Sequence, residues 1–270
     1  LWVRKPLCQI QETICIYGDY DADGIPGSVI MSEFFTKIGY ENFFVYIPHR
    51  NREGFGLNTF ALDIIKDKGT KLIITIDCAS ANVSEVEYAN SLGMDVIITD
   101  HHEVPDTLPN AYALVNPKRA DCNYPEKMLC GSGVIYKVIQ HLIKKGGFDI
   151  HEGWEKWLLD MVGVATISDM VPLTGENRIF AYYGLEVLKK TRRPGLLKLF
   201  SLNRVNQKSI TEDDVSFLIT PKINAASRMG EPILAYNLLT SKTEQDADVS
   251  ARELLRINDK RKVEVTKIVK

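Results

Sequence analysis

The sequence has little of what would place it in a membrane or outside the cell. Its five cysteines are odd in number and form no CxxC pair, so neither a disulfide framework nor a thiolate zinc site is indicated. No run of about 18 apolar residues could cross a bilayer, and the N-terminus lacks the basic, apolar and small-residue order of a signal peptide. We expect a cytoplasmic protein whose cysteines are free thiols, most of them buried.

An excess of either charge is also missing, because the formal net charge is only −2. The two parts of the chain nevertheless differ. Residues 186–270 carry 17 Lys and Arg against 11 Asp and Glu, which leaves 16 against 24 in residues 1–185. The acidic part is suited to cations and the basic part to phosphates. Two differently solvated surfaces would explain the same asymmetry.

The first half of the chain alternates short β-branched runs with amphipathic stretches. Continuous apolar runs separated by helices are typical of a parallel sheet that is covered on both faces. We therefore predict an α/β fold with an open, mostly parallel, doubly wound sheet. The expected strands are residues 14–17, 44–47, 72–76, 96–99 and 113–115, and the expected helices lie near 26–38, 58–68 and 83–92.

The second half is expected to be helical, because strand-like runs stop near residue 131. Helical patterns follow at residues 133–145, 153–166, 176–190, 195–201 and 231–240. Residues 243–270 contain no Gly or Pro and keep spaced apolar residues amid charges, which predicts one long helix. We expect a catalytic domain over residues 1–240, divided near residue 130 into α/β and helical parts. Residues 241–270 would connect it to a missing second domain.

Carboxylates follow three of the predicted strands. Asp19, Asp21 and Asp23 come after the first, Asp77 follows the third, and Asp100 with His101 and His102 follows the fourth. The carboxyl ends of parallel strands meet at one crevice, where so many like charges would repel one another unless cations neutralised them. Carboxylates with imidazoles suit Mn²⁺ or Mg²⁺. Two ions about 4 Å apart could support phosphodiester hydrolysis.

Simpler explanations exist for each motif alone. The segment from Gly18 to Gly24 could be a polar turn, but it is no EF-hand, because Ile30 stands where the closing Glu should be. Asp77 could cap the next helix. Asp169 before a Val-Pro turn is typical of a cap or an Asx-turn. Asp100-His101-His102 is the most specific motif.

Asp100-His101-His102 resembles the signature of the DHH phosphoesterases, and residues 18–24 resemble their first aspartate motif. The chain is most similar to the RecJ-like exonucleases of that family, from about residue 11 to 265. The further matching segments, in the order of the family, are residues 47–50, 53–58, 115–118, 168–173 and 221–229.

The resemblance implies a ligand set for two ions, with Asp77 bridging them. The implied ligands are Asp21, Asp23, Asp77, His101 and Asp169, with Asp19 as a further candidate. It also implies that His102 approaches the scissile phosphate, while Asp100 orients His101. The implied catalytic set is thus His102, Asp100 and Asp77. Arg50, Asn224 and Arg228 are the candidates for substrate phosphates, and Arg52 is a weaker one.

Two details complicate this assignment. Many family members have a histidine where this chain has Tyr17, which removes one expected ligand and leaves a tyrosine that we expect to be buried. Gly131-Ser132-Gly133 precedes a predicted helix, so its backbone N–H groups could bind an anion or simply form a tight turn.

The implied function is metal-dependent 5′-to-3′ hydrolysis of single-stranded DNA in repair and recombination. The implied protein partners are a helicase or a single-strand-binding protein, and the chain is expected to be a monomer without membrane contacts. Two alternatives stay open. One is a DHH phosphodiesterase acting on short oligonucleotides, cyclic dinucleotides or pyrophosphate, and the other is a catalytically silent DNA-binding relative.

Overall fold

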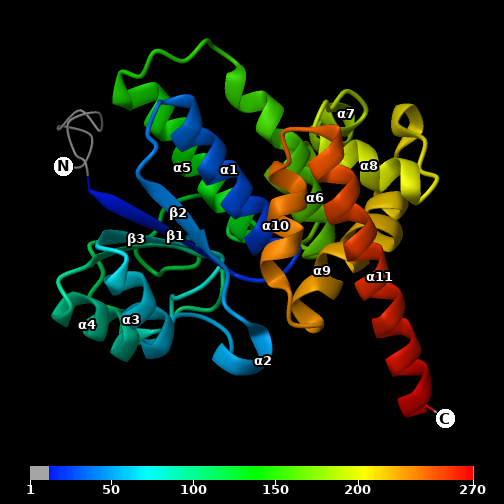
Figure 1. The fold of residues 1–270 in the computed structure, drawn as a ribbon. Helices are drawn as coiled ribbons and strands as arrows, with labels where there is room; N and C mark the ends of the chain where they lie inside the picture. The colour runs from blue at the N-terminus through cyan, green and yellow to red at the C-terminus, as the bar shows by residue number, and fades with distance from the viewer. Residues whose placement is uncertain (1–11, 270) are drawn as a thin grey trace.

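A computed structural model of the chain describes residues 12–269. Its strands are β1 (Thr13–Gly18), β2 (Phe43–Tyr46), β3 (Thr70–Ile76), β4 (Asp95–Thr99) and β5 (Ala113–Val115). They form one parallel sheet in the order β2-β1-β3-β4-β5 (Figure 1). The chain adds β2 on one side of β1 and the later strands on the other side, so the strand order reverses between β1 and β3. All five predicted strands and the doubly wound parallel sheet are therefore confirmed.

Helices cover both faces of the sheet, as Figure 1 shows. On one face α1 (Gly24–Lys37) and α5 (Gly131–Gly146) pack against the strands, and on the other lie α3 (Thr59–Asp67) and α4 (Val83–Ser91). Each face has its own buried apolar cluster, which explains why the strands are continuous, mainly apolar runs without polar alternation. A short helix, α2 (Arg50–Glu53), follows β2.

The remaining chain is helical, as predicted. Its α-helices are α6 (Leu159–Ser168), α7 (Gly175–Leu188), α8 (Pro194–Leu202), α9 (Thr220–Arg228), α10 (Pro232–Thr240) and α11 (Glu244–Val269). The short 3₁₀ segments are Trp154–Leu158 and Gln207–Ser209, and Asp214–Ile219 is a π-helix. Helices α6 and α10 pack on α1, so the helical part shares its core with one face of the sheet.

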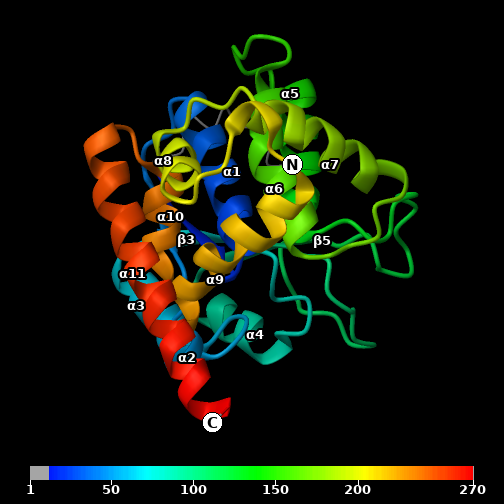
Figure 2. The same cartoon turned by 90° about the vertical axis from the view of Figure 1, so that its right-hand side faces the viewer.

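Helix α11 confirms the long C-terminal helix that the sequence predicts. Its first half packs on α8, α9 and α10 through Ala247, Ala251, Leu254 and Ile257. The side chains of residues 262–267 are exposed, and Figures 1 and 2 show this end extending beyond the other helices. Its role as a connector stays a prediction.

The expectations about membrane-spanning segments and about free cysteines can be compared with the described residues. Within residues 12–269, no helix is both long and apolar enough to span a membrane. Cys15, Cys78 and Cys130 are buried free thiols and Cys122 is a half-buried one, in agreement with the expectation of free, mostly buried cysteines. Cys8 lies outside the described residues.

Candidate metal centre

The strand register places four polar residues in a row at one edge of the sheet. Gly18 pairs with Ile76, Ile76 with Thr99, and Thr99 with Val115. The next residues along these strands are therefore Asp19, Asp77, Asp100 and Asn116. Backbone N–H groups of the three aspartates bond to the neighbouring strand at 2.9–3.1 Å, which extends the sheet by one residue. This row lies where the strand order reverses, the usual ligand-binding edge of such sheets.

Asp77 has an unusual backbone conformation. Its φ is +64°, in the left-handed region, which Asp tolerates better than most residues with a side chain. Left-handed backbone costs free energy for residues other than glycine, so it persists only where the surrounding structure holds it. Such residues are found mainly at functional sites. Here the turn brings Asp77 Oδ1 to 3.0 Å from His101 Nε2.

His101 joins segments that are far apart in the sequence. Besides Asp77, its Nε2 lies 3.7 Å from Asp23 Oδ2 and 3.7 Å from Asp169 Oδ2. Asp169 directly follows α6 and ends that helix. The groups whose ligand atoms lie within 4.8 Å of one another are Asp77-His101-His102, Asp23-His101-Asp169 and Asp19-Asp21-Asp77. All six residues proposed as metal ligands therefore meet in one cluster, and His102 lies beside them.

The contacts of Asp100 differ from the expected ones. Its Oδ1 lies 2.8 Å from His102 Nδ1 and accepts from the backbone N–H groups of His101 and His102, while Oδ2 accepts from Ser80 N. The imidazole that Asp100 orients is thus that of His102, and the expectation for His101 was wrong. Sequence spacing could not distinguish the two, because which ring turns toward the carboxylate depends on the backbone after β4.

Sequence reasoning also missed the residues that support His102. Asn116 donates through Nδ2 to the His102 carbonyl and to Ser80 Oγ, at 2.9 Å each. The aromatic ring of Phe55 stands 5.2 Å from the imidazole, nearly edge-on, and about half of its surface is exposed. The match of residues 115–118 to the family was the only sequence signal for Asn116.

The cluster is electrostatically unbalanced without a cation. Burial, and then the neighbouring carboxylates, raise the pKa of Asp19 to about 8 and that of Asp169 to about 7. The same causes raise the pKa values of Asp21 and Asp77. Asp19 Oδ1 is buried and accepts no hydrogen bond from the described residues, and the contact with His101 Nε2 is the one polar contact of the buried Asp77 Oδ1 within 3.0 Å among them. Buried carboxylate oxygens beside an imidazole, one of them without a donor, fit a divalent cation.

Metal-free protein should lose stability as the pH rises. The pKa of Asp19 is raised from 3.8 to about 8 in the fold, so the folded chain binds this proton more tightly than the unfolded chain does. Stability is therefore highest below about pH 4 for this group and falls up to about pH 8. In chelator, we expect the thermal midpoint to drop by at least about 5 °C between pH 5 and pH 8.

The test is a thermal unfolding series with and without Mn²⁺. Saturating Mn²⁺ should recover the loss at pH 8, and Asp19→Asn should raise the pH 8 midpoint in chelator. A metal-free midpoint that stays flat or rises over this range would contradict the electrostatic description.

Tyr17 and the phosphate candidates occupy different surroundings. Tyr17 is fully buried, donates to Gly56 O at 2.8 Å and stacks on Tyr46, so it is a packing residue as expected.

Arg50 is exposed and lies over the Tyr20 ring at 5.2 Å. Asn224 Oδ1 accepts a hydrogen bond from Ala22 N at 2.8 Å, which connects α9 to residues 19–23, the segment after β1 that carries three of the aspartates. Arg228, one turn later, is exposed.

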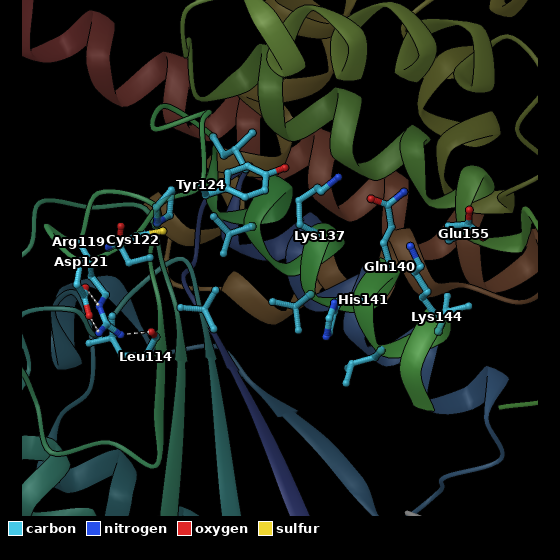
Figure 3. Close-up of a pocket in the computed structure, with 18 of the residues that line it drawn as sticks. Leu114, Arg119, Asp121, Cys122, Tyr124, Lys137, Gln140, His141, Lys144 and Glu155 are labelled. Atoms are coloured by element: carbon cyan, nitrogen blue, oxygen red, sulfur yellow. Dashed lines mark hydrogen bonds and ion pairs between the residues drawn. The ribbon is translucent and has the colours of Figure 1, made fainter. Parts of the chain in front are cut away.

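A cavity of about 1080 Å³ borders this site through Asn116, which is one of its lining residues. It opens between α5 and the segment that follows β5, and Figure 3 shows Lys137, His141 and Lys144 on its helical side. None of the proposed metal ligands lines it. The chemistry of the acidic cluster therefore belongs to the sheet edge and not to this cavity.

Comparison with known proteins agrees with this geometry. The sequence model of the DHH family, N-terminal domain, matches residues 13–166. The single-stranded-DNA-specific exonuclease RecJ of Bacillus subtilis is 40% identical over 266 residues, which are 98% of this chain and 33% of that protein. The crystal structure of exonuclease RecJ bound to manganese superposes with a TM-score of 0.86 at 30% identity, covering 97% of this chain and 65% of that one.

A further solved structure is RecJ from Thermus thermophilus in complex with Mn²⁺. It has a TM-score of 0.80 at 29% identity and covers 97% of this chain and 37% of that one. The chain thus spans about a third of the length of the Bacillus relative and less than two thirds of either solved chain. Since the matched model spans more than half of the chain and includes the carboxylates after β1, β3 and β4, the chain belongs to the DHH family.

Proposed function

We propose that this chain is the catalytic domain of a metal-dependent exonuclease that hydrolyses single-stranded DNA from the 5′ end. The observation that carries the proposal is the convergence of five aspartates and His101, in which the buried Asp19 Oδ1 accepts no hydrogen bond from the described residues. The RecJ relatives, two of them solved with manganese, support the substrate and the ion. The 5′-to-3′ direction rests on the family resemblance.

The chain's own residues would divide the work as follows. Asp21, Asp23, Asp77, His101 and Asp169 would hold two Mn²⁺ or Mg²⁺ ions, with Asp19 as a further ligand. When bound, such ions make a water more acidic and stabilise the leaving oxygen in phosphodiester hydrolysis.

His102 is suited to the phosphate. Its side chain is 45% exposed, and the hydrogen bond to Asp100 is the main cause that raises the pKa of His102. The raised pKa keeps the imidazole cationic to higher pH, where it can stabilise charge that develops on a phosphate oxygen. Because Nδ1 bonds to Asp100, Nε2 is the atom that would face the substrate.

Arg228 is the arginine on which we expect substrate affinity to depend most. Replacing it in Arg228→Gln removes one phosphate contact, so single-stranded DNA should bind about 5- to 10-fold more weakly. The slope of log affinity against log salt should fall by about one. Arg178→Gln, the same change at an exposed position of α7, is the control. Fluorescence anisotropy over a salt series measures both; equal salt slopes for Arg228→Gln and wild type would contradict this role.

The function is tested with single-stranded DNA labelled at its 5′ or 3′ end and incubated with Mn²⁺. Early release of a labelled mononucleotide from the 5′ end, a ladder of shortened 3′-labelled strands and complete inhibition by chelator are expected. Faster hydrolysis of a dinucleotide than of a long strand would favour the alternative DHH phosphodiesterase. Binding without any cleavage would favour the silent DNA-binding relative.

A further inference from the structure

The N-terminus of α5 has a set of hydrogen bonds that metal ligation and phosphate contact leave unexplained. The backbone N–H groups in the first turn of a helix have no partner within the helix. In α5 the side chain of Cys130 accepts from Gly133 N. The N–H groups of Gly131 and Ser132 are left to bind an acceptor from elsewhere in the fold.

That acceptor is the carboxylate of Asp23, more than 100 residues earlier in the chain. Gly131 N donates to Asp23 Oδ2 at 2.6 Å, and Ser132 N donates to Oδ1 at 2.7 Å. The Ser132 hydroxyl also donates to the Asp23 backbone carbonyl at 2.7 Å. Both residues are buried, Asp23 with 2% and Ser132 with none of its surface exposed. The anion that the Gly-Ser-Gly motif binds is therefore a side chain of the protein itself.

Gly131 also borders Asp77. A Cβ added at Gly131 would lie 2.6 Å from both Oδ1 and Cβ of Asp77. The φ of Gly131 is outside the left-handed region, so its backbone would accept alanine. The requirement for glycine is thus one of space beside the Asp77 carboxylate.

We propose that Gly131 and Ser132 are positioning residues of the metal centre. The two charge-assisted hydrogen bonds from Gly131 N and Ser132 N fix the orientation of the Asp23 carboxylate. Because Gly131 has no side chain, the Asp77 carboxylate can lie against its backbone. The positive end of the α5 dipole offsets part of the repulsion within the cluster. This inference rests on the proposed function only in taking Asp23 and Asp77 as metal ligands.

The test compares Gly131→Ala with Gly133→Ala in Mn²⁺ binding measured by calorimetry. Both changes add one methyl group to the first turn of α5, but a Cβ at Gly133 has its nearest neighbour at 3.5 Å, an ordinary contact. We expect Gly131→Ala to bind Mn²⁺ about 10- to 100-fold more weakly than wild type, and Gly133→Ala to bind within about 3-fold of it. The electron paramagnetic resonance spectrum of bound Mn²⁺ should change in Gly131→Ala alone.

A second variant keeps the inference testable if Gly131→Ala does not fold. Ser132→Ala removes only the hydroxyl bond to the Asp23 carbonyl and should weaken Mn²⁺ binding about 3- to 10-fold, with a changed resonance spectrum. Wild-type affinity and spectrum in whichever variant folds would overturn the positioning role while leaving the proposed function intact. Absence of Mn²⁺ binding by wild-type protein would instead overturn the metal centre of the proposed function.

Discussion

Asp77→Asn is expected to abolish metal-dependent cleavage, with a loss of at least about 10³-fold. The change replaces one oxygen of the carboxylate that is proposed to bridge two ions with an amide nitrogen and removes its negative charge. Asn is the replacement of choice, since it tolerates the left-handed backbone that Asp77 adopts. Mn²⁺ binding should weaken in parallel, as measured by calorimetry.

The same substitution should leave metal-free protein as stable as wild type or more stable. Burial and the neighbouring carboxylates raise the pKa of Asp77, so its charge opposes folding in the absence of a cation. The control is Asp95→Asn, the same change at an exposed residue where β4 begins, at the opposite edge of the sheet. Retained cleavage, or a lower metal-free midpoint in chelator, would argue against Asp77 as a ligand.

His102→Ala is expected to lower kcat for single-stranded DNA about 10²- to 10³-fold, while Mn²⁺ affinity stays within about 3-fold of wild type. The reason is that His102 is held by Asp100 and is partly exposed, whereas His101 is nearly buried among the carboxylates. Single-turnover kinetics and calorimetry separate the two quantities.

His141→Ala, on the exposed side of α5, serves as the matched control (Figure 3). A loss of Mn²⁺ affinity above about 10-fold in His102→Ala would make His102 a metal ligand, which the contact group of Asp77, His101 and His102 would also permit.

The five strands and the parallel, doubly wound arrangement could be predicted because their signal is local, whereas the strand order β2-β1-β3-β4-β5 was not predicted. Each strand is a short, mainly apolar run, and the helices near residues 26–38, 58–68 and 83–92 show apolar spacing. Helix α9 was missed because Pro221 and the small residues 224–227 resemble a loop. In the structure, Pro221 stands in the first turn, where its missing N–H is tolerated.

The site residues that could be predicted from the sequence are those that directly follow a predicted strand. Parallel strands must bring Asp19, Asp77 and Asp100 to one edge, so those positions follow from the alternation of elements. Asp169 has no such signal and came only from the resemblance. The bonds from Gly131 and Ser132 to Asp23 join residues over 100 positions apart, a contact that no local pattern encodes.

The acidic cluster at the sheet edge is expected to hold two divalent ions. The direct measurement is anomalous X-ray scattering at the manganese edge from crystals grown with Mn²⁺. Two peaks about 4 Å apart within the cluster are the expected result. Manganese peaks located only outside the cluster of Asp23, Asp77, His101 and Asp169 would contradict it.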